Sequence, residues 1–234
     1  MALTKKSLKI KISKETGTVS ALLYAPAKPK AILVFAHGAG AGIKNKFMET
    51  VAVTLGELGI ATLRFNFPYM EAGKKVPDRK PVATTAVAAA VEKASELYPK
   101  LPVFAGGKSF GGRMTSTAAS EDMLDDIKGI VFFGFPLHAP GKPSSDRAAH
   151  LFEVKVPMLF LQGTRDALAS YDLMKQLCKK LGNLPAATTV QAGKSTLYTI
   201  EGADHSFHVP KDNKLSDPEV INMICNEIKS WIGK

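Results

Sequence analysis

The chain has 234 residues, of which 45% are hydrophobic and 22% are charged, which excludes an intrinsically disordered chain and allows one sizeable hydrophobic core. The 31 basic and 21 acidic residues give a net charge of +10, but no aromatic and basic motif accompanies this charge, so we expect no binding of nucleic acid.

The first predicted elements are strands. Two short alternating segments, 8–12 and 18–24, flank a turn at residues 15–17 and predict a β-hairpin. Apolar runs that do not alternate follow it, a pattern typical of strands buried on both faces of a parallel sheet. These runs are 31–36, 60–65, 103–106, 130–134 and 157–161, and a more mixed run at 196–200 suits an outer strand.

Helical patterns separate these runs, at residues 46–58, 82–97, 110–119, 171–181 and 218–231. Regular alternation of strand and helix predicts one α/β domain over residues 1–234, with about eight strands in a mostly parallel sheet and helices on both faces. The long loop-like stretches 66–80 and 135–147 each follow a strand, so we expect both at the carboxyl edge of the sheet, where α/β proteins place their sites.

The sequence carries no sign of secretion or of a membrane span. No apolar h-region follows Met1, and no apolar run approaches the roughly 18 residues that a span needs. The two cysteines, Cys178 and Cys225, are too few for a disulfide framework, so we expect buried free thiols. A cytoplasmic protein without membrane contact is the expectation.

The central motif is Gly-Lys-Ser-Phe-Gly at residues 107–111, a Gly-x-Ser-x-Gly pattern. Alone this pattern is weak, but here it directly follows a predicted buried strand and directly precedes a predicted helix. That context is typical of a nucleophile elbow, in which a tight turn presents the serine hydroxyl above the sheet. The motif therefore predicts Ser109 as the nucleophile.

A serine hydroxyl needs a base, and the base needs a carboxylate to fix its tautomer. His205 lies on the segment after the last predicted strand and is favoured over His208, three residues further on. Asp166 follows the strand at 157–161 and is favoured over Asp172, which falls inside a helix, and over Asp204, which adjoins the base. The predicted order along the chain is serine, aspartate, histidine.

An oxyanion hole requires two backbone donors aimed at the developing alkoxide. The sequence predicts the N–H of Phe110, which follows the serine, and the N–H of Ala39 in the glycine-rich segment 37–42. Glycines in that segment let the backbone approach a substrate closely. No Cys/His cluster has zinc spacing and no complete nucleotide motif is present, so we expect no metal and no cofactor.

Five segments together carry a resemblance to a known family: His-Gly-Ala-Gly at 37–40, Arg-Phe-Asn-Phe-Pro-Tyr at 64–69, Gly-Lys-Ser-Phe-Gly-Gly-Arg-Met at 107–114, Gly-Thr-Arg-Asp at 163–166 and Asp-His-Ser at 204–206. The chain resembles the small, uncapped α/β-hydrolases related to dienelactone hydrolase, and within them the testis-expressed-protein-like branch. The resemblance implies the α/β-hydrolase fold without a large lid. Dienelactone hydrolases proper use a cysteine nucleophile, so serine at this position argues against lactone opening of that kind.

The expected function is hydrolysis of a small ester, thioester or related acyl compound, with a peptide bond as a variant. A non-catalytic interaction module on the same fold is the alternative, because fold does not fix function. The expected partner is a small acyl molecule, and the protein is expected to be a monomer or homodimer. Apolar residues of the two long loops are predicted to form the pocket walls: Phe67, Tyr69, Met70, Phe135, Leu137 and His138.

Overall fold

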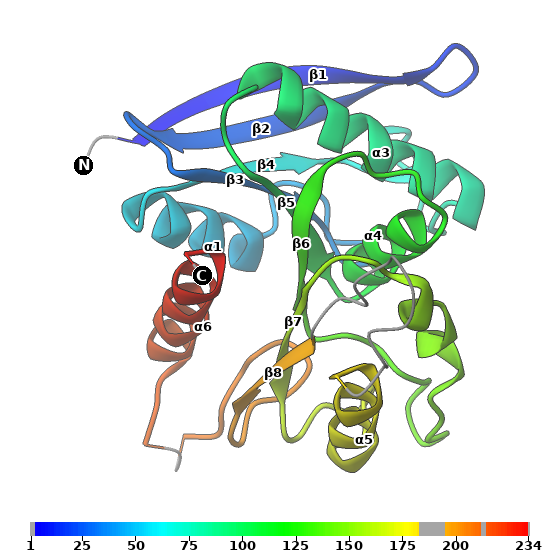
Figure 1. The fold of residues 1–234 in the computed structure, drawn as a ribbon, viewed down its shortest axis with the longest axis vertical. Helices are drawn as coiled ribbons and strands as arrows, with labels where there is room; N and C mark the ends of the chain where they lie inside the picture. Colours follow the sequence, from blue (N-terminus) through cyan, green and yellow to red (C-terminus); the bar gives the residue numbers. More distant parts are fainter. Residues whose placement is uncertain (1–2, 183–194, 212–213, 234) are drawn as a thin grey trace.

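The computed structural model describes residues 3–182, 195–211 and 214–233. Its centre is an eight-stranded sheet in the order β1-β2-β4-β3-β5-β6-β7-β8 (Figure 1). The strands are β1 (Leu3–Ser13), β2 (Gly17–Pro26), β3 (Ala31–Ala36), β4 (Ile60–Phe65), β5 (Val103–Lys108), β6 (Ile127–Phe133), β7 (Met158–Gly163) and β8 (Ser195–Ile200).

The sheet is mostly parallel, as predicted. Only the β1–β2 hairpin and the β2–β4 pair are antiparallel, while the neighbours from β4 through β3 to β8 all run in parallel. The order reverses at β3, because β4 lies on one side of it and β5 on the other. Sites in open α/β sheets form at the carboxyl ends of strands beside such a reversal, which here are the ends of β3 and β5.

Helices cover both faces of the sheet (Figure 1). One face carries α1 (Lys46–Glu57) and α6 (Asp217–Ile232), and the other carries α3 (Lys80–Leu97), α4 (Phe110–Ser120) and α5 (Tyr171–Gly182). Along β3 the side chains alternate between the two cores: Leu33 and Phe35 pack with α1 and α6, whereas Ile32 and Val34 pack on the opposite face. Burial on both faces explains the continuous apolar runs in the sequence.

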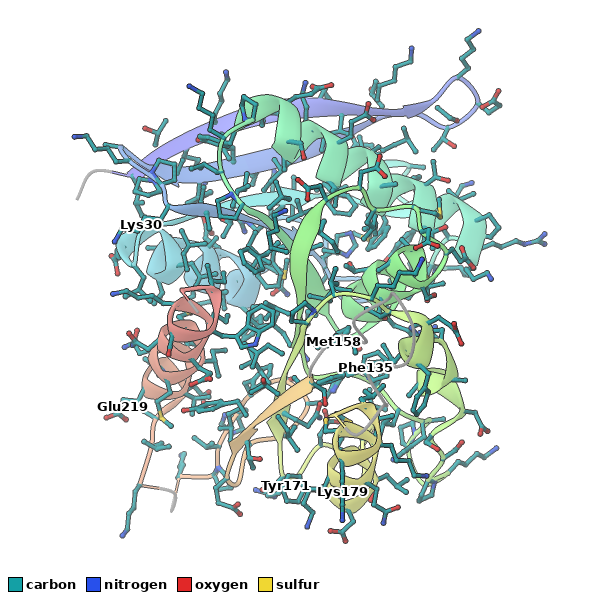
Figure 2. All side chains as sticks on the ribbon, viewed as in Figure 1. Lys30, Phe135, Met158, Tyr171, Lys179 and Glu219 are labelled. Atoms are coloured by element: carbon teal, nitrogen blue, oxygen red, sulfur yellow. The ribbon has the colours of Figure 1, made fainter. Side chains whose placement is uncertain are left out.

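Side chains follow the same division between core and surface (Figure 2). Phe135 and Met158 are each 1% exposed, while Lys179 and Glu219 extend into solvent from α5 and α6. A short helix α2 (Pro68–Glu71) lies in the stretch 66–80 that the sequence predicted as a loop, and a 3-10 helix η1 (Asp146–Glu153) begins at the end of the predicted loop 135–147. Both are shorter than the window of about 11 residues over which helical periodicity is recognised, which is why the pattern missed both.

The predicted absence of a large lid is confirmed for the described residues. The segment between β6 and β7 spans residues 134–157 and contains η1 as its helical element. In the described ranges, every helix is too short or too polar to cross a lipid bilayer.

Candidate active site

Ser109 lies on a strained turn between β5 and α4. Its backbone has φ 50° and ψ −112°, a conformation that costs a non-glycine residue of the order of 1–3 kcal/mol. Two glycines make the turn possible: a Cβ on Gly107 would lie 2.6 Å from the carbonyl carbon of Gly111, and one on Gly111 would lie 2.5 Å from the carbonyl oxygen of Ala36. The close approach of strand and helix aims the serine side chain outward, as the motif predicted.

A chain of short contacts links the three predicted residues. The Ser109 Oγ lies 2.9 Å from His205 Nε2, and His205 Nδ1 lies 2.7 Å from Asp166 Oδ2. The His205 side chain is 23% exposed and the Asp166 side chain is 0% exposed. The structure thus brings together one nucleophile, one imidazole and one shielded carboxylate from three separate segments.

Asp166 is held in place by donors on several sides. Its Oδ2 also accepts a hydrogen bond from Gln162 Nε2 at 2.6 Å, and its Oδ1 accepts one from the backbone N–H of Leu168 at 2.8 Å. Gly163, at the end of β7, lets the two loops meet, because a Cβ there would lie 2.2 Å from the carbonyl oxygen of Ala203. The carboxylate therefore has one fixed position beneath the imidazole.

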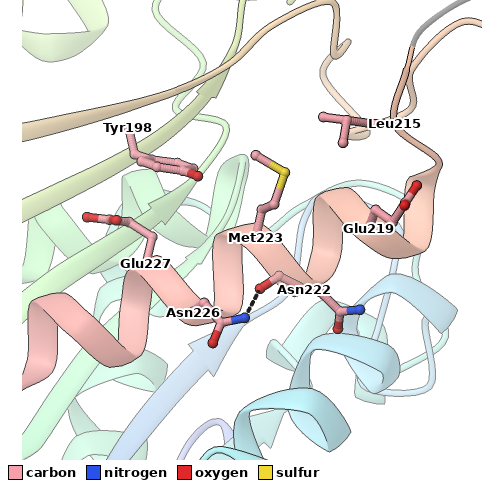
Figure 3. Close-up of a pocket in the computed structure, with 7 residues that line it drawn as sticks. All are labelled: Tyr198, Leu215, Glu219, Asn222, Met223, Asn226 and Glu227. Atoms are coloured by element: carbon pink, nitrogen blue, oxygen red, sulfur yellow. Dashed lines mark hydrogen bonds between the residues drawn. The ribbon is translucent and has the colours of Figure 1, made fainter.

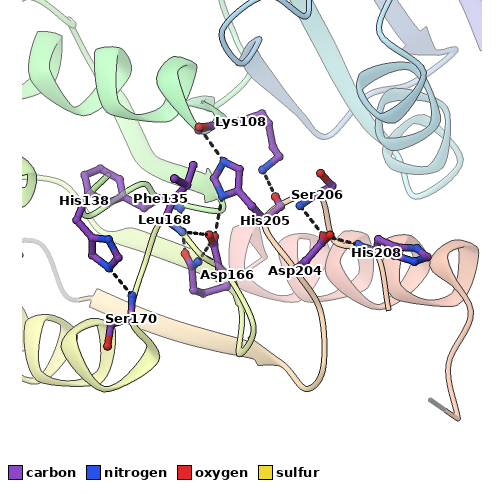
Figure 4. A network of polar contacts seen from close by, with 12 residues as sticks. Lys108, Phe135, His138, Asp166, Leu168, Ser170, Asp204, His205, Ser206 and His208 are labelled. Carbon is purple, nitrogen blue, oxygen red and sulfur yellow. Dashed lines mark hydrogen bonds and ion pairs between the residues drawn. The ribbon is translucent and has the colours of Figure 1, made fainter. Parts of the chain in front are cut away.

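The loop after β8 is a tight turn built on Asp204 (Figure 4). The Asp204 Oδ1 accepts hydrogen bonds from the N–H groups of Ser206 and His208, so this carboxylate is occupied by its own turn. His208 is exposed and its Nδ1 lies 2.8 Å from Asp217 Oδ2, which holds its pKa above the usual value. Neither Asp204 nor His208 contacts the serine, and the other rival, Asp172, pairs with Lys175 on α5.

Lys108, which flanks the elbow in the sequence, also belongs to this site. Its side chain turns back across the loop and donates a hydrogen bond to the carbonyl oxygen of His205, and its ammonium lies 5.2 Å from the ring centroid of Phe207. Burial lowers the Lys108 pKa to about 8, partly offset by the charges of Asp166 and Asp204. The sequence placed Lys108 beside the elbow but gave no signal for its contact with the His205 loop.

Of the two predicted oxyanion donors, Ala39 lines the cavity over Ser109, and Phe110 follows the serine in the chain. Phe110 is the first residue of α4, and Ala39 lies in the glycine-rich loop after β3. No acceptor within the described ranges pairs with either N–H. A Cβ on Gly38 would lie 3.8 Å from the Ser109 Cβ, so this loop passes close to the serine. The arrangement leaves two backbone donors near Ser109 without a protein partner.

A cavity of about 410 Å³ opens over Ser109 and His205. Its lining comes from the loop after β3 and from the first turn of α1, with Lys108 and Leu168 on the other sides. Phe47 of α1 stacks on Phe207 at a centroid distance of 5.6 Å, which ties this wall to the loop that carries His205. This volume lies in the range typical of small-molecule sites.

The predicted pocket walls are corrected by the structure. None of the six residues lines this cavity, whose apolar surface comes from Phe47, Met48 and Leu168 instead. Four of the six are almost fully buried in the core: Phe67, Tyr69, Phe135 and Leu137. The other two contact neighbouring loops, Met70 beside Gly42 and His138 as the acceptor of the Ser170 N–H.

Phe67 and Tyr69 turn inward because α2 begins at Pro68 and folds the loop back under the β3 segment. The N–H of Phe67 donates to His37 Nε2, and the Tyr69 hydroxyl accepts from the N–H of Gly40 at 2.8 Å. Burial lowers the His37 pKa to about 4, so this imidazole is neutral and can accept that bond. These aromatic residues brace the glycine-rich loop from behind rather than face a substrate.

Other hollows offer less chemistry. One of them, of about 540 Å³, lies between β8 and α6 and is lined by residues such as Tyr198, Met223 and Glu227 (Figure 3). No serine, histidine or cysteine is among its lining residues, so it offers no nucleophile. Within the described ranges, no group of three or more His, Cys, Asp or Glu side chains could hold a metal ion.

The sequence matches a family model described as an alpha/beta hydrolase domain over residues 29–233. It is also 30% identical over 200 residues to a protein of Mycobacterium tuberculosis that is named, provisionally, as a phosphoribosyl transferase. That match covers 82% of this chain and 40% of the relative, so the chain spans less than half of that protein's length.

Solved structures share the fold. A dienelactone hydrolase from Anabaena variabilis superposes with a TM-score of 0.74 at 18% identity, covering 100% of this chain and 98% of that one. A serine hydrolase without a lid from Xanthomonas campestris gives a TM-score of 0.71 at 19% identity, covering 97% and 94%. At these identities the likeness shows a common fold, and the fold is the one that the sequence motifs predicted.

Proposed function

This chain belongs to the α/β-hydrolase family, and we propose that within the family it acts as a serine hydrolase of small esters, thioesters or related acyl compounds. One observation carries the proposal: the continuous contact from Ser109 Oγ through the His205 ring to the buried Asp166 carboxylate, at 2.9 and 2.7 Å. A base within hydrogen-bonding distance of a serine, itself oriented by a third group, is the arrangement that nucleophilic catalysis needs.

In the proposed first step, Ser109 Oγ attacks the carbonyl carbon while its proton moves to His205 Nε2. The imidazolium that forms is stabilised by Asp166, which has no solvent exposure to weaken the interaction. The carbonyl oxygen gains negative charge, and in this proposal the N–H groups of Ala39 and Phe110 donate hydrogen bonds to it.

The tetrahedral intermediate then collapses. The bond to the alcohol or thiol breaks, and the leaving group takes the proton from His205 as the acyl group stays on Ser109 as an ester. Water next attacks this ester, with His205 taking its proton and returning it to the serine oxygen. The products are one carboxylic acid and one alcohol or thiol, and the enzyme is regenerated.

Labelling with a fluorophosphonate probe, read by intact mass, tests the proposal. The probe phosphonylates an activated serine with loss of fluoride, so the wild-type protein should gain one adduct. Ser109→Ala and His205→Ala should gain none, because one lacks the nucleophile and the other lacks its base. His208→Ala is the matched control and should label like wild type, since this exposed histidine pairs with Asp217.

Two outcomes would count against the proposal. A folded wild-type protein that stays unlabelled would favour the non-catalytic interaction module instead. Labelling that persists in Ser109→Ala would place the reactive group elsewhere in the chain.

A further inference from the structure

A second hollow, of about 200 Å³, lies beside α4. Its lining comes from three segments. Asp78 and Lys80 lie just before and at the start of α3. Phe110, Arg113 and Thr117 lie on one face of α4, spaced by three and four residues, and Arg147 and His150 come from η1, which packs against α4. We call it the Arg113–Arg147 hollow. It shares no lining residue with the cavity over Ser109.

Arg113 has no partner for its charge within the described part of the chain. Its guanidinium makes no hydrogen bond or ion pair there, and its Nε is buried without an acceptor. Buried polar groups are normally paired, so an acceptor supplied by a ligand would gain a hydrogen bond at this Nε.

The second arginine adds to the same positive field. Arg147 Nη1 donates to the carbonyl oxygen of His138 at 3.0 Å, and no carboxylate of the described residues pairs with it. Both arginines line the same hollow, and burial together with the charge of Arg147 lowers the pKa of Arg113. Like charges kept close without a counter-ion raise the energy of the empty hollow.

Nearby acids do not neutralise this pair. Glu121 pairs with Lys80 at 2.8 Å. Asp78, the one carboxylate among the lining residues, accepts the N–H of Tyr69 through its Oδ2 at 3.0 Å and balances at most one of the two arginine charges. His150 is neutral near pH 7, because burial and the charge of Arg113 lower its pKa to about 4, and its Nε2 lies 2.7 Å from the Ser116 hydroxyl. The hollow therefore keeps an excess of positive charge.

We propose that the Arg113–Arg147 hollow binds a phosphoryl group, either free phosphate or a phosphate monoester. Each guanidinium group supplies donors in a planar fork that fits the oxygens of a phosphoryl group. Two positive charges also favour a phosphate dianion over a ligand with one carboxylate. Among the other lining residues, Lys80 adds a third cation, while the apolar side chains of Phe110 and Met114 add no acceptor that would compete for the arginines.

Calorimetric titration of the full-length chain with inorganic phosphate tests this site, at constant ionic strength in a buffer free of phosphate. Wild type should bind saturably, and Arg113→Gln and Arg147→Gln should each weaken binding by about tenfold or more, the effect expected when a charge-assisted hydrogen bond is lost. Lys6→Gln is the control, since it removes the same charge from an exposed position on β1 and should change the affinity less than twofold.

Thermal unfolding supplies an independent readout. A ligand that binds only the folded chain raises its Tm, so phosphate should raise the Tm of wild type and of Lys6→Gln but not that of Arg147→Gln. If Arg113→Gln does not fold, Arg113→Lys replaces it, because lysine keeps the charge and loses the fork. A parallel titration with methyl phosphate distinguishes the two ligands. A monoester site binds methyl phosphate at least as tightly as inorganic phosphate, whereas a site for the free ion binds it more weakly.

Three results would overturn the proposal: no saturable phosphate binding to folded wild type, equal binding by both arginine variants, or displacement of phosphate by equimolar acetate. Each readout is binding rather than turnover. Failure here therefore leaves the serine hydrolase proposal untouched, and failure of serine labelling leaves this one untouched.

Discussion

Replacing Asp166 with asparagine changes one oxygen into an NH₂ group and tests the proposed hydrolase most directly. All three groups that contact the carboxylate are donors: the His205 Nδ1–H, the Gln162 Nε2–H and the Leu168 N–H. An amide has one oxygen, so its NH₂ group must occupy one of the two carboxylate oxygen positions. At either position this new donor faces a donor of the protein. No rotation of the new side chain avoids this conflict.

The two amide orientations have different consequences. If the NH₂ takes the Oδ1 position, it faces the N–H of Leu168, and a buried donor left unpaired costs about 1–3 kcal/mol. If it takes the Oδ2 position, His205 can accept from it only by moving its own proton to Nε2. That nitrogen then faces Ser109 as a donor and cannot act as its base. Rotating the Gln162 amide offers no relief, because its Oε1 already accepts the N–H of Phe135 at 3.0 Å.

The expected effect of Asp166→Asn on turnover is therefore large. A serine hydrolase whose histidine is held in the wrong tautomer loses about 10³- to 10⁴-fold in kcat, with a smaller change in KM. Hydrolysis of a p-nitrophenyl ester of a short acid, followed by absorbance, measures both constants. The free energy of unfolding should fall by roughly 1–3 kcal/mol at the same time.

Asp172→Asn is the matched control for this experiment. It removes a carboxylate from the exposed face of α5, where Asp172 pairs with Lys175, and should leave kcat within about twofold of wild type. The reasoning is refuted if folded Asp166→Asn keeps more than about a tenth of the wild-type kcat, or if Asp172→Asn loses as much.

Two further predictions concern the Lys108 contact. Gly134→Ala should lower the free energy of unfolding by about 1–3 kcal/mol and lower turnover, because Gly134 has φ 70° and a Cβ there would lie 3.0 Å from Lys108 Nζ and 3.4 Å from His205 Nδ1. Gly141 has the same φ with open space around it, so urea unfolding of Gly141→Ala measures the backbone part of that loss alone. Burial lowers the Lys108 pKa from 10.5 to about 8, so between these pH values the unfolded chain binds more protons and the free energy of unfolding rises with pH by up to roughly 3 kcal/mol. Unfolding measured from pH 7 to 10.5 should show a smaller rise in Lys108→Met than in wild type. An equal rise in the two proteins would contradict this prediction.

The sheet and the positions of the three proposed catalytic residues were predictable because they depend on local patterns. Continuous apolar runs indicated strands buried on both faces, and such strands end at a common edge. Each of the three then comes soon after one of those ends: Ser109 follows β5, Asp166 follows β7 and His205 follows β8. Sequence order along a parallel sheet is sufficient to bring such residues to one edge.

The cavity walls were not predictable by the same reasoning. The direction of a side chain in a loop depends on how that loop folds, and α2 turns Phe67 and Tyr69 into the core. The residues that do line the cavity, such as Phe47 and Met48, lie at the start of α1, where the helical pattern shows which face is apolar but not which end meets the site. Lys108 gave no signal either, because its partner is a backbone carbonyl 97 residues away.

The glycines around the site explain why its geometry is more constrained than its residue types suggest. At Gly163 a Cβ would lie 2.2 Å from the carbonyl oxygen of Ala203, so the Asp166 loop and the His205 loop meet backbone to backbone. At Gly111 the same test gives 2.5 Å to the backbone of β3, which fixes the elbow against the loop that holds Ala39. Backbone contacts cannot relax as side chains do. Main-chain contacts thus hold the proposed nucleophile, base, acid and oxyanion donors relative to one another. Substitutions of the side chains that line the cavity can therefore leave these groups in place.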